Sequence, residues 1–219
     1  MERNIDMNEV SDGKFYTAKD MVRADCGGCH GCSVCCHGMG SSITLDPMDI
    51  CRLCGGLHTS FSALMPDKIE LNIADSLILP NLRMTGKEEA CAFLNQEERC
   101  GIHSFRPGIC RLFPLGRFYE DGSFRYFLQT HECPKENKSK VKVKKWVDTP
   151  DLKQYEQFIC DWHYYLKALQ EKIKADPEQM KTISMEVLER FYVMPYDQER
   201  DFYSQFYERL GKESHLYGR

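Results

Sequence analysis

Apolar and polar residues alternate in residues 61–84, and this pattern predicts a pair of strands. Apolar side chains stand at Ile69, Leu71 and Ile73, and a proline-bounded apolar run follows them. A period of two is typical of a strand with one buried face. A further short strand is expected just upstream, over residues 41–45.

A second hairpin is indicated where two aromatic-rich runs flank an Asp-Gly step. The runs are residues 117–119 and 124–127, and Asp121-Gly122 lies between them. Asp-Gly favours the left-handed backbone of a two-residue turn, so the two runs are expected to pair as antiparallel strands.

Two helices are expected in the N-terminal third of the chain. Asp46 can cap a helix whose first residue is Pro47, and Gly55-Gly56 is expected to end that helix. Residues 1–25 are interpreted as an arm that contains a short helix over residues 16–23, because charge is spread over most of its faces.

From residue 151 onward the apolar period changes to three and four residues. This spacing predicts one long amphipathic helix, and shorter helices are expected near residues 178–192 and 197–210. The apolar face of the long helix is formed by Leu152, Tyr155, Ile159, Trp162, Leu166, Leu169 and Ile173.

The order of these elements predicts an α+β fold in three parts. Residues 1–25 form the arm, residues 26–146 a small irregular cysteine-rich metal-binding domain with short strands, and residues 147–219 an α-helical C-terminal module. The boundary near residue 147 is placed where a lysine-rich segment gives way to the helical period.

Composition indicates where the protein is located and which chemistry its cysteines perform. The net charge of −4 gives no overall preference for nucleic acid or anionic membranes. No apolar run is long enough for a secretory signal or a membrane span, so a cytoplasmic protein without membrane contact is expected. In a reducing compartment, the 12 cysteines favour thiolate ligands over disulfides.

Five cysteines are crowded into the stretch "DCGGCHGCSVCCHGMG", residues 25–40. Glycines interleave with them, so the backbone can turn around a metal and point its amide groups at thiolate sulfurs. The spacing resembles the C-x2-C-x2-C run of bacterial ferredoxins. The five candidate ligands of this opening run are Cys26, Cys29, Cys32, Cys35 and Cys36.

Four more candidate ligands occur in a second segment, at Cys91, Cys100, Cys110 and Cys133. Nine thiols exceed the four that one simple centre uses, which predicts two centres or one larger centre. These four are expected beside turns, outside regular elements. The three other cysteines are interpreted as buried packing residues: Cys51, Cys54 and Cys160.

Histidines and arginines near these cysteines each allow two interpretations. A histidine can replace a thiolate, so His30, His37 and His103 are alternative ligands, although thiols already outnumber the positions. Arginines around the second segment either offset thiolate charge or pair with surface carboxylates. They are Arg106, Arg111 and Arg117.

The basic segment Lys135–Lys145 alternates lysines with Val141 and Val143. This pattern is typical of a half-exposed edge strand, where lysine guards against aggregation. Nucleic-acid binding is the alternative reading, but aromatic residues that stack on bases are sparse in the segment and the protein is acidic overall.

Both cysteine segments resemble the YkgJ-type cysteine-cluster family, a zinc- or iron-chelating domain marked by CxxCxxCC. Cys29, Cys32, Cys35 and Cys36 match that core, and "CAFLNQEERCGIHSFRPGICRLFP" over residues 91–114 resembles the second half of the family pattern. The resemblance implies metal chelation and no particular reaction. Flagellin lysine N-methylases are similar through the same cluster.

Three functional classes follow from these observations. An iron–sulfur centre with a redox or assembly role is favoured, because the spacings are ferredoxin-like and the thiols outnumber one zinc tetrahedron. A zinc-stabilised interaction module is the alternative. A protein-modifying enzyme related to flagellin lysine N-methylase rests on the resemblance alone. In the first two classes the expected partner is a protein rather than nucleic acid.

Overall fold

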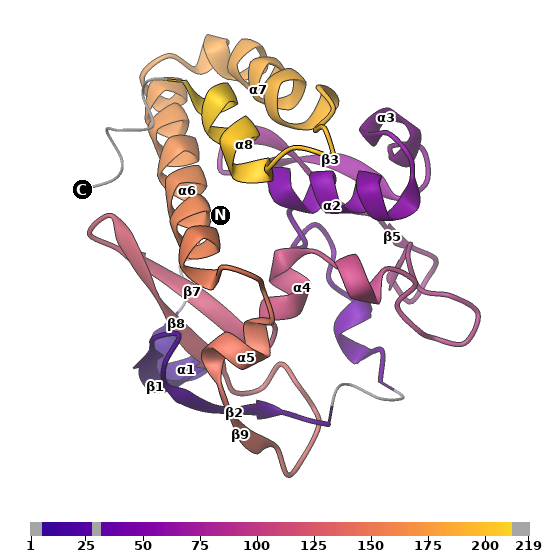
Figure 1. Ribbon diagram of the computed structural model, residues 1–219, viewed down its shortest axis with the longest axis vertical. Helices are drawn as coiled ribbons and strands as arrows, with labels where there is room; N and C mark the ends of the chain where they lie inside the picture. Colours follow the sequence, from indigo (N-terminus) through magenta and orange to yellow (C-terminus); the bar gives the residue numbers. More distant parts are fainter. Residues whose placement is uncertain (1–5, 28–31, 212–219) are drawn as a thin grey trace.

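The computed structural model describes residues 6–27 and 32–211, and it has the expected α+β architecture. Two central helices, α2 (Pro47–Leu57) and α4 (Gly108–Leu112), lie beside a long helix, α6 (Leu152–Ala175), and short antiparallel strands surround them (Figure 1). In the order of the chain the first element is α1 (Met7–Val10), one turn long. The cysteine segments lie among the short strands and loops.

A three-stranded antiparallel sheet contains the hairpin that the Asp-Gly step predicts. Its order is β1 (Ser11–Tyr16), β8 (Ser123–Gln129) and β7 (Leu115–Glu120). Asp121 and Gly122 both have positive φ, 49° and 73°, as a tight hairpin turn requires. The hairpin prediction is therefore confirmed.

The helix expected over residues 16–23 is wrong, because this stretch turns and then forms a strand. Strand β2 (Met21–Asp25) pairs antiparallel with β9 (Ser139–Lys142). Val22 and Ala24 are buried to 1% and 0% exposure while their neighbours point outward, which is the period of a strand. Strand β9 confirms the edge strand predicted in the basic segment, and α5 (Val143–Val147) follows it at once.

The second hairpin joins β3 (Ile69–Ala74) to β4 (Leu77–Leu82), as expected. Its buried face differs from the prediction, because Leu71 and Ile73 are 40% and 67% exposed. Most of the burial comes from β4 instead. The strand expected over residues 41–45 is reduced to one bridge between Thr44 and Asn81. A third, shorter pair consists of β5 (Met84–Thr85) and β6 (Ala90–Cys91).

Helix α2 (Pro47–Leu57) begins as the sequence predicts and ends later. The Asp46 and Asp49 side chains each accept a hydrogen bond from the other's backbone N–H. The helix runs through Gly55-Gly56, where a Cβ would lie 2.3 Å from the Gln198 side chain and 2.7 Å from the Phe105 ring. These glycines serve close packing instead of termination. A one-turn helix, α3 (Phe61–Leu64), follows.

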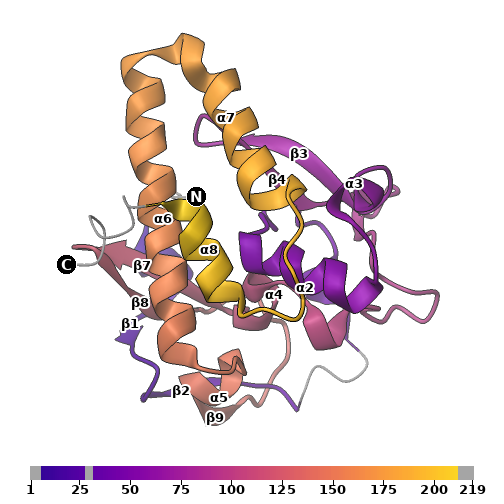
Figure 2. The same ribbon diagram turned by 45° about the horizontal axis from the view of Figure 1, so that its top comes forward.

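The C-terminal third has the predicted helices. Helix α6 (Leu152–Ala175) precedes a 3-10 turn (Pro177–Gln179), α7 (Met180–Leu188), a π-helical turn (Glu189–Val193) and α8 (Phe202–Leu210). Of the seven predicted apolar positions of α6, six are buried and Leu152 is half-buried. Helix α8 lies alongside α6, and α7 lies over the β3–β4 hairpin (Figure 2). No described helix is long and apolar enough to cross a membrane.

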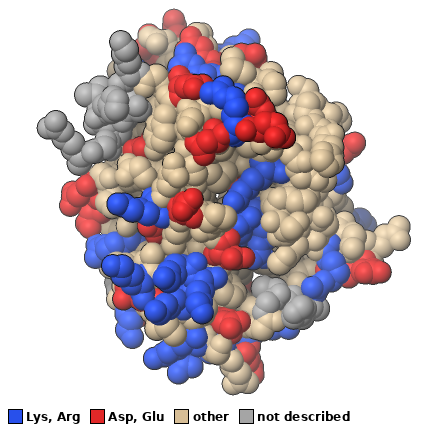
Figure 3. All heavy atoms as spheres, viewed as in Figure 1, with Lys and Arg blue, Asp and Glu red and all other residues tan. Residues whose placement is uncertain are grey.

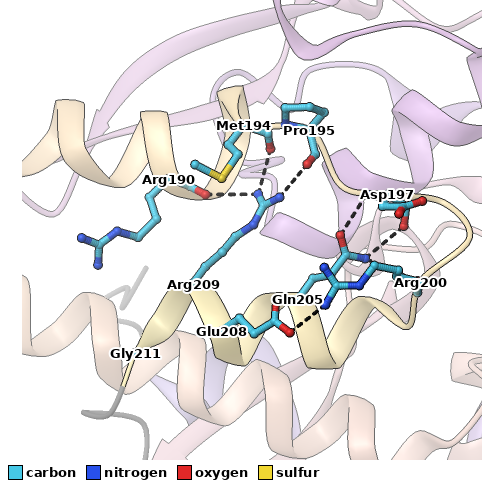
Figure 4. Close-up of a pocket in the computed structure, with 9 residues that line it drawn as sticks. All are labelled: Arg190, Met194, Pro195, Asp197, Arg200, Gln205, Glu208, Arg209 and Gly211. Carbon is cyan, nitrogen blue, oxygen red and sulfur yellow. Dashed lines mark hydrogen bonds and ion pairs between the residues drawn. The ribbon is translucent and has the colours of Figure 1, made fainter.

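Arg209 of α8 holds the turn that leads into this helix (Figure 4). Its guanidinium donates hydrogen bonds to the carbonyl oxygens of Arg190, Met194 and Pro195, at 3.1, 2.8 and 2.6 Å. A shallow hollow is lined by these residues, and it contains no cysteine. The hollow is therefore a structural junction, and the cysteines gather elsewhere.

Candidate metal centre

The two cysteine segments meet through backbone pairing. The last part of the opening run forms a 3-10 turn, Val34–Cys36. Directly after it, His37 forms a bridge with Ala90, and the Gly38 N–H donates to the Glu89 carbonyl at 3.1 Å. Since Ala90 precedes Cys91 in β6, this pairing places Cys35 and Cys36 beside the second segment.

A tight loop brings Cys100 back to Cys91. Cys100 forms a bridge with Leu94, and the Gly101 N–H donates to the Phe93 carbonyl at 2.8 Å. A 3-10 turn, His103–Phe105, leads from this loop toward α4 (Gly108–Leu112). Cys91 lies in a strand and Cys110 in a helix, so the expectation that these thiols stand outside regular elements is wrong for both.

Helix α4 carries Cys110, and the buried carboxylate of Asp49 binds its first residue. The Gly108 N–H donates to Asp49 Oδ1 at 2.7 Å, and Asp49 is 3% exposed. A Cβ at Gly108 would lie 2.1 Å from the Tyr155 hydroxyl, so only glycine fits there. The start of α4 is thus fixed against both α2 and α6.

Five thiols lie close enough to change one another's acidity. A hydrogen bond between the two adjacent thiols lowers the pKa of Cys35 and raises that of Cys36. Burial raises the pKa of Cys110, and the neighbouring Asp49, Cys91, Cys35 and Cys100 raise it further. We call Cys35, Cys36, Cys91, Cys100 and Cys110 the five-thiol group.

A comparison with protein families matches the part of the chain that carries these thiols. Residues 28–137, half of the chain, match the family described as "CxxCxxCC: Putative zinc- or iron-chelating domain". The chain belongs to the CxxCxxCC family. No match was found among curated proteins or solved structures. The matched range contains the whole five-thiol group.

Basic side chains lie beside the five-thiol group of this CxxCxxCC domain. Burial raises the pKa of both Cys91 and Cys100, while Lys68 acts against this rise at Cys91 and Arg106 acts against it at Cys100. Arg106 also helps to lower the pKa of Cys35. A positive charge near thiolates stabilises their ionised form, which is the form that binds metal.

The other two arginines of the sequence prediction are engaged elsewhere. Arg111 donates to the carbonyl oxygen of Asp148 at 2.8 Å, and Arg117 donates to the Tyr155 hydroxyl at 3.2 Å. Arg106, by contrast, acts on Cys100 of the second segment and on Cys35 of the opening run.

The remaining predicted ligands of the CxxCxxCC domain stand near the ends of its segments. Cys26 directly follows β2, Cys32 comes three residues before Cys35, and the Cys133 carbonyl accepts a hydrogen bond from Lys138 at 2.8 Å. Cys29, like His30, falls in residues 28–31, outside the described residues. A ligand role stays a prediction for these four cysteines, as it does for the five-thiol group.

The two candidate histidine ligands that the structure describes, His37 and His103, have other partners. His37 Nε2 lies 2.8 Å from Glu98 Oε2, and the same oxygen accepts a hydrogen bond from the Ser33 hydroxyl at 2.9 Å. His103 Nε2 lies 3.1 Å from an Arg106 nitrogen. Glu98 therefore ties the opening run to the Cys91–Cys100 loop.

Three residues of the site were missed by the sequence analysis: Asp49, Lys68 and Glu98. For Asp49 a signal existed, because its spacing from Asp46 is that of a capping box. Neither Lys68 nor Glu98 carries a local signal. Lys68 acts on Cys91 and Glu98 binds Ser33 and His37, and both contacts depend on the tertiary fold.

The three cysteines interpreted as packing residues lie outside the five-thiol group. Cys160 is buried on α6 and donates from its sulfur to the Gly122 carbonyl at 3.0 Å. Cys51 on α2 lies 3.6 Å from the Gln198 amide nitrogen. Cys54 is half-buried one turn further along α2 and packs against the apolar core.

The five-thiol group fits zinc or iron by its donor chemistry. Among residues 6–27 and 32–211, no three His, Cys, Asp or Glu side chains are yet arranged as ligands of one ion. A bound cation would offset the repulsion among the thiolates and hold their sulfurs together. Soft thiolates select zinc, copper(I) and iron–sulfur clusters.

Proposed function

We propose that the chain binds an iron–sulfur centre through thiolates of both cysteine segments, and that the centre serves a redox or assembly role in the cytoplasm. One observation carries this proposal. The two segments bring five described thiols together, and the opening run has the short two-residue spacings of bacterial ferredoxins. An iron–sulfur centre takes four thiolates, so this group can supply a complete ligand set.

The charges around the group support a cluster that carries net negative charge. Arg106 acts on Cys35 and Cys100, and Lys68 acts on Cys91. When bound, an iron–sulfur centre supplies one-electron transfer at a potential set by its charge, its hydrogen bonds and its exposure. The role of Arg106 and Lys68 would be to stabilise the reduced, more negative state.

A structural zinc site is the second candidate, and the irregular backbone of the site favours it. Between β6 and α4 the chain has only turns, single bridges and one 3-10 turn, so neither a sheet nor a long helix holds it. In small domains of this kind a metal replaces part of the hydrophobic core, and its binding energy becomes folding energy.

The two candidates differ in colour and in composition. After anaerobic purification of the full chain, we expect a brown protein with visible absorption, bound iron and acid-labile sulfide, since iron–sulfur charge transfer absorbs there. Zinc has a filled d shell and gives a colourless protein. A colourless protein with stoichiometric zinc and no sulfide would replace the first candidate by the second.

A further inference from the structure

The β2–β9 ribbon has one buried face and one strongly basic face. Its pairing sets Met21 opposite Lys142 and Arg23 opposite Lys140, and all four side chains are exposed. The residues between them point inward: Val22 and Ala24 are fully buried and Val141 is half-buried. Over these two pairs the outward face therefore presents three cations and one methionine. At the end of the ribbon the Asp25 carboxylate accepts hydrogen bonds from the Gly27 N–H and the Ser139 hydroxyl.

More basic side chains extend this face at both ends. Lys144 and Lys145 of α5 are exposed directly after β9. At the other end, a shallow hollow of about 390 Å³ is lined by four residues, three of them basic: Arg23, Lys135, Lys138 and Asn137. We call the whole set the basic surface: Arg23, Lys135, Lys138, Lys140, Lys142, Lys144 and Lys145.

The positive charges of the basic surface are clustered on one part of an acidic protein. The protein carries −4 overall, yet Lys and Arg side chains gather over the region of β2, β9 and α5 (Figure 3). Within the described residues, none of its lysines forms an ion pair with a carboxylate. Lysines that guard an edge strand lie on that strand, but four lysines of the basic surface lie outside β9.

The surface adjoins two of the predicted metal ligands. Cys26 is the first residue after β2, and the Cys133 carbonyl accepts a hydrogen bond from the Lys138 ammonium at 2.8 Å. A molecule bound on the ribbon would therefore lie next to the start of the opening run and the end of the second cysteine segment.

We propose that the basic surface docks a protein partner that presents a cluster of Asp and Glu side chains. Opposite charges steer such partners together and fix their register. A protein fits better than single-stranded nucleic acid, because bases stack on aromatic side chains and the outward face has none. It has instead Met21, 46% exposed, whose flexible thioether suits an apolar contact at the centre of a protein interface.

The test uses the full, metal-loaded chain and two fluorescent probes, a twelve-residue peptide of alternating Glu and Asp and a twelve-nucleotide oligothymidylate. Anisotropy titrations at low ionic strength compare K140E/K142E with the matched variant K153E/K181E, which reverses two exposed lysines on α6 and α7. We expect the ribbon variant to weaken peptide binding about tenfold or more, and the matched variant to change it less than about twofold.

Three results would overturn the proposal. They are no peptide binding, equal weakening by both variants, or tighter binding of oligothymidylate than of the peptide with the same dependence on Lys140 and Lys142. Metal content is measured on every sample. It is expected to be unchanged in both variants, so that a failure of docking is distinguished from a failure of the metal centre. Amide NMR shifts confined to residues 21–25 and 138–145 would support the site independently.

Discussion

Replacing Cys110 by serine is expected to remove bound metal and to lower the stability of the protein at the same time. Cys110 sits on α4 amid Cys35, Cys91 and Cys100, so it joins the opening run to the second segment. Loss of a thiolate ligand should weaken metal affinity by about a hundredfold or more. Since metal binds the folded chain, a hundredfold loss lowers the apparent free energy of unfolding by about 2.7 kcal/mol.

Cys36→Ser should give the same paired result, because Cys36 comes from the other segment of the five-thiol group. Metal analysis and thermal unfolding after anaerobic purification measure both effects. Cys160→Ser is the matched control, since its thiol donates to the Gly122 carbonyl and a serine hydroxyl can do so too. Unchanged metal stoichiometry in both Cys36→Ser and Cys110→Ser would show that these thiols are not ligands.

The second large loss of stability is expected on substitution of Asp49, which is not a proposed metal ligand. Its carboxylate accepts hydrogen bonds from the Gly108 N–H at 2.7 Å and the Asp46 N–H at 3.0 Å. Burial raises the pKa of Asp49, while these bonds and the charges of Arg52 and Arg117 favour its ionised form. Asp49→Ala leaves two buried N–H groups without a partner, which should cost about 2–5 kcal/mol of unfolding free energy.

Metal affinity should fall in the same variant, because α4 would lose the contact that positions Cys110. Asp49→Asn keeps one acceptor oxygen and should lie between the wild type and Asp49→Ala in chemical denaturation. Asp201→Ala provides the control: it removes another helix cap, the 2.7 Å bond from the Ser204 N–H, at a cost of about 1 kcal/mol. If Asp201→Ala lowered metal affinity as much as Asp49→Ala, the positioning role of Asp49 would be wrong.

Elements with a strong local code could be predicted from the sequence. The three-to-four-residue period of α6 and the Asp-Gly turn between β7 and β8 each depend on contacts close in the chain. The N-terminal strand β2 could not be predicted in this way. Its partner, β9, lies more than one hundred residues away, and isolated from it residues 16–23 have no preference strong enough to indicate a strand.

Only part of the candidate metal centre could likewise be predicted from the sequence. Cysteine spacing alone indicated a metal and nominated all members of the five-thiol group, because soft ligands crowded around glycines have few other uses. Which thiols become neighbours depends on the bridge between His37 and Ala90 and on the capping of α4 by Asp49. Those contacts join residues 50 to 60 positions apart, so no local pattern reveals them.

X-ray absorption spectroscopy at the metal edge tests the central claim most directly, namely that thiolates from both cysteine segments hold the metal. On anaerobically purified protein we expect a first shell made of sulfur, with additional iron–iron scattering if an iron–sulfur cluster is bound, or four sulfurs at about 2.3 Å if the metal is zinc. In Cys110→Ser the sulfur shell should be depleted. A first shell of nitrogen and oxygen in the wild-type protein, or an unchanged sulfur shell in Cys110→Ser, would contradict this account.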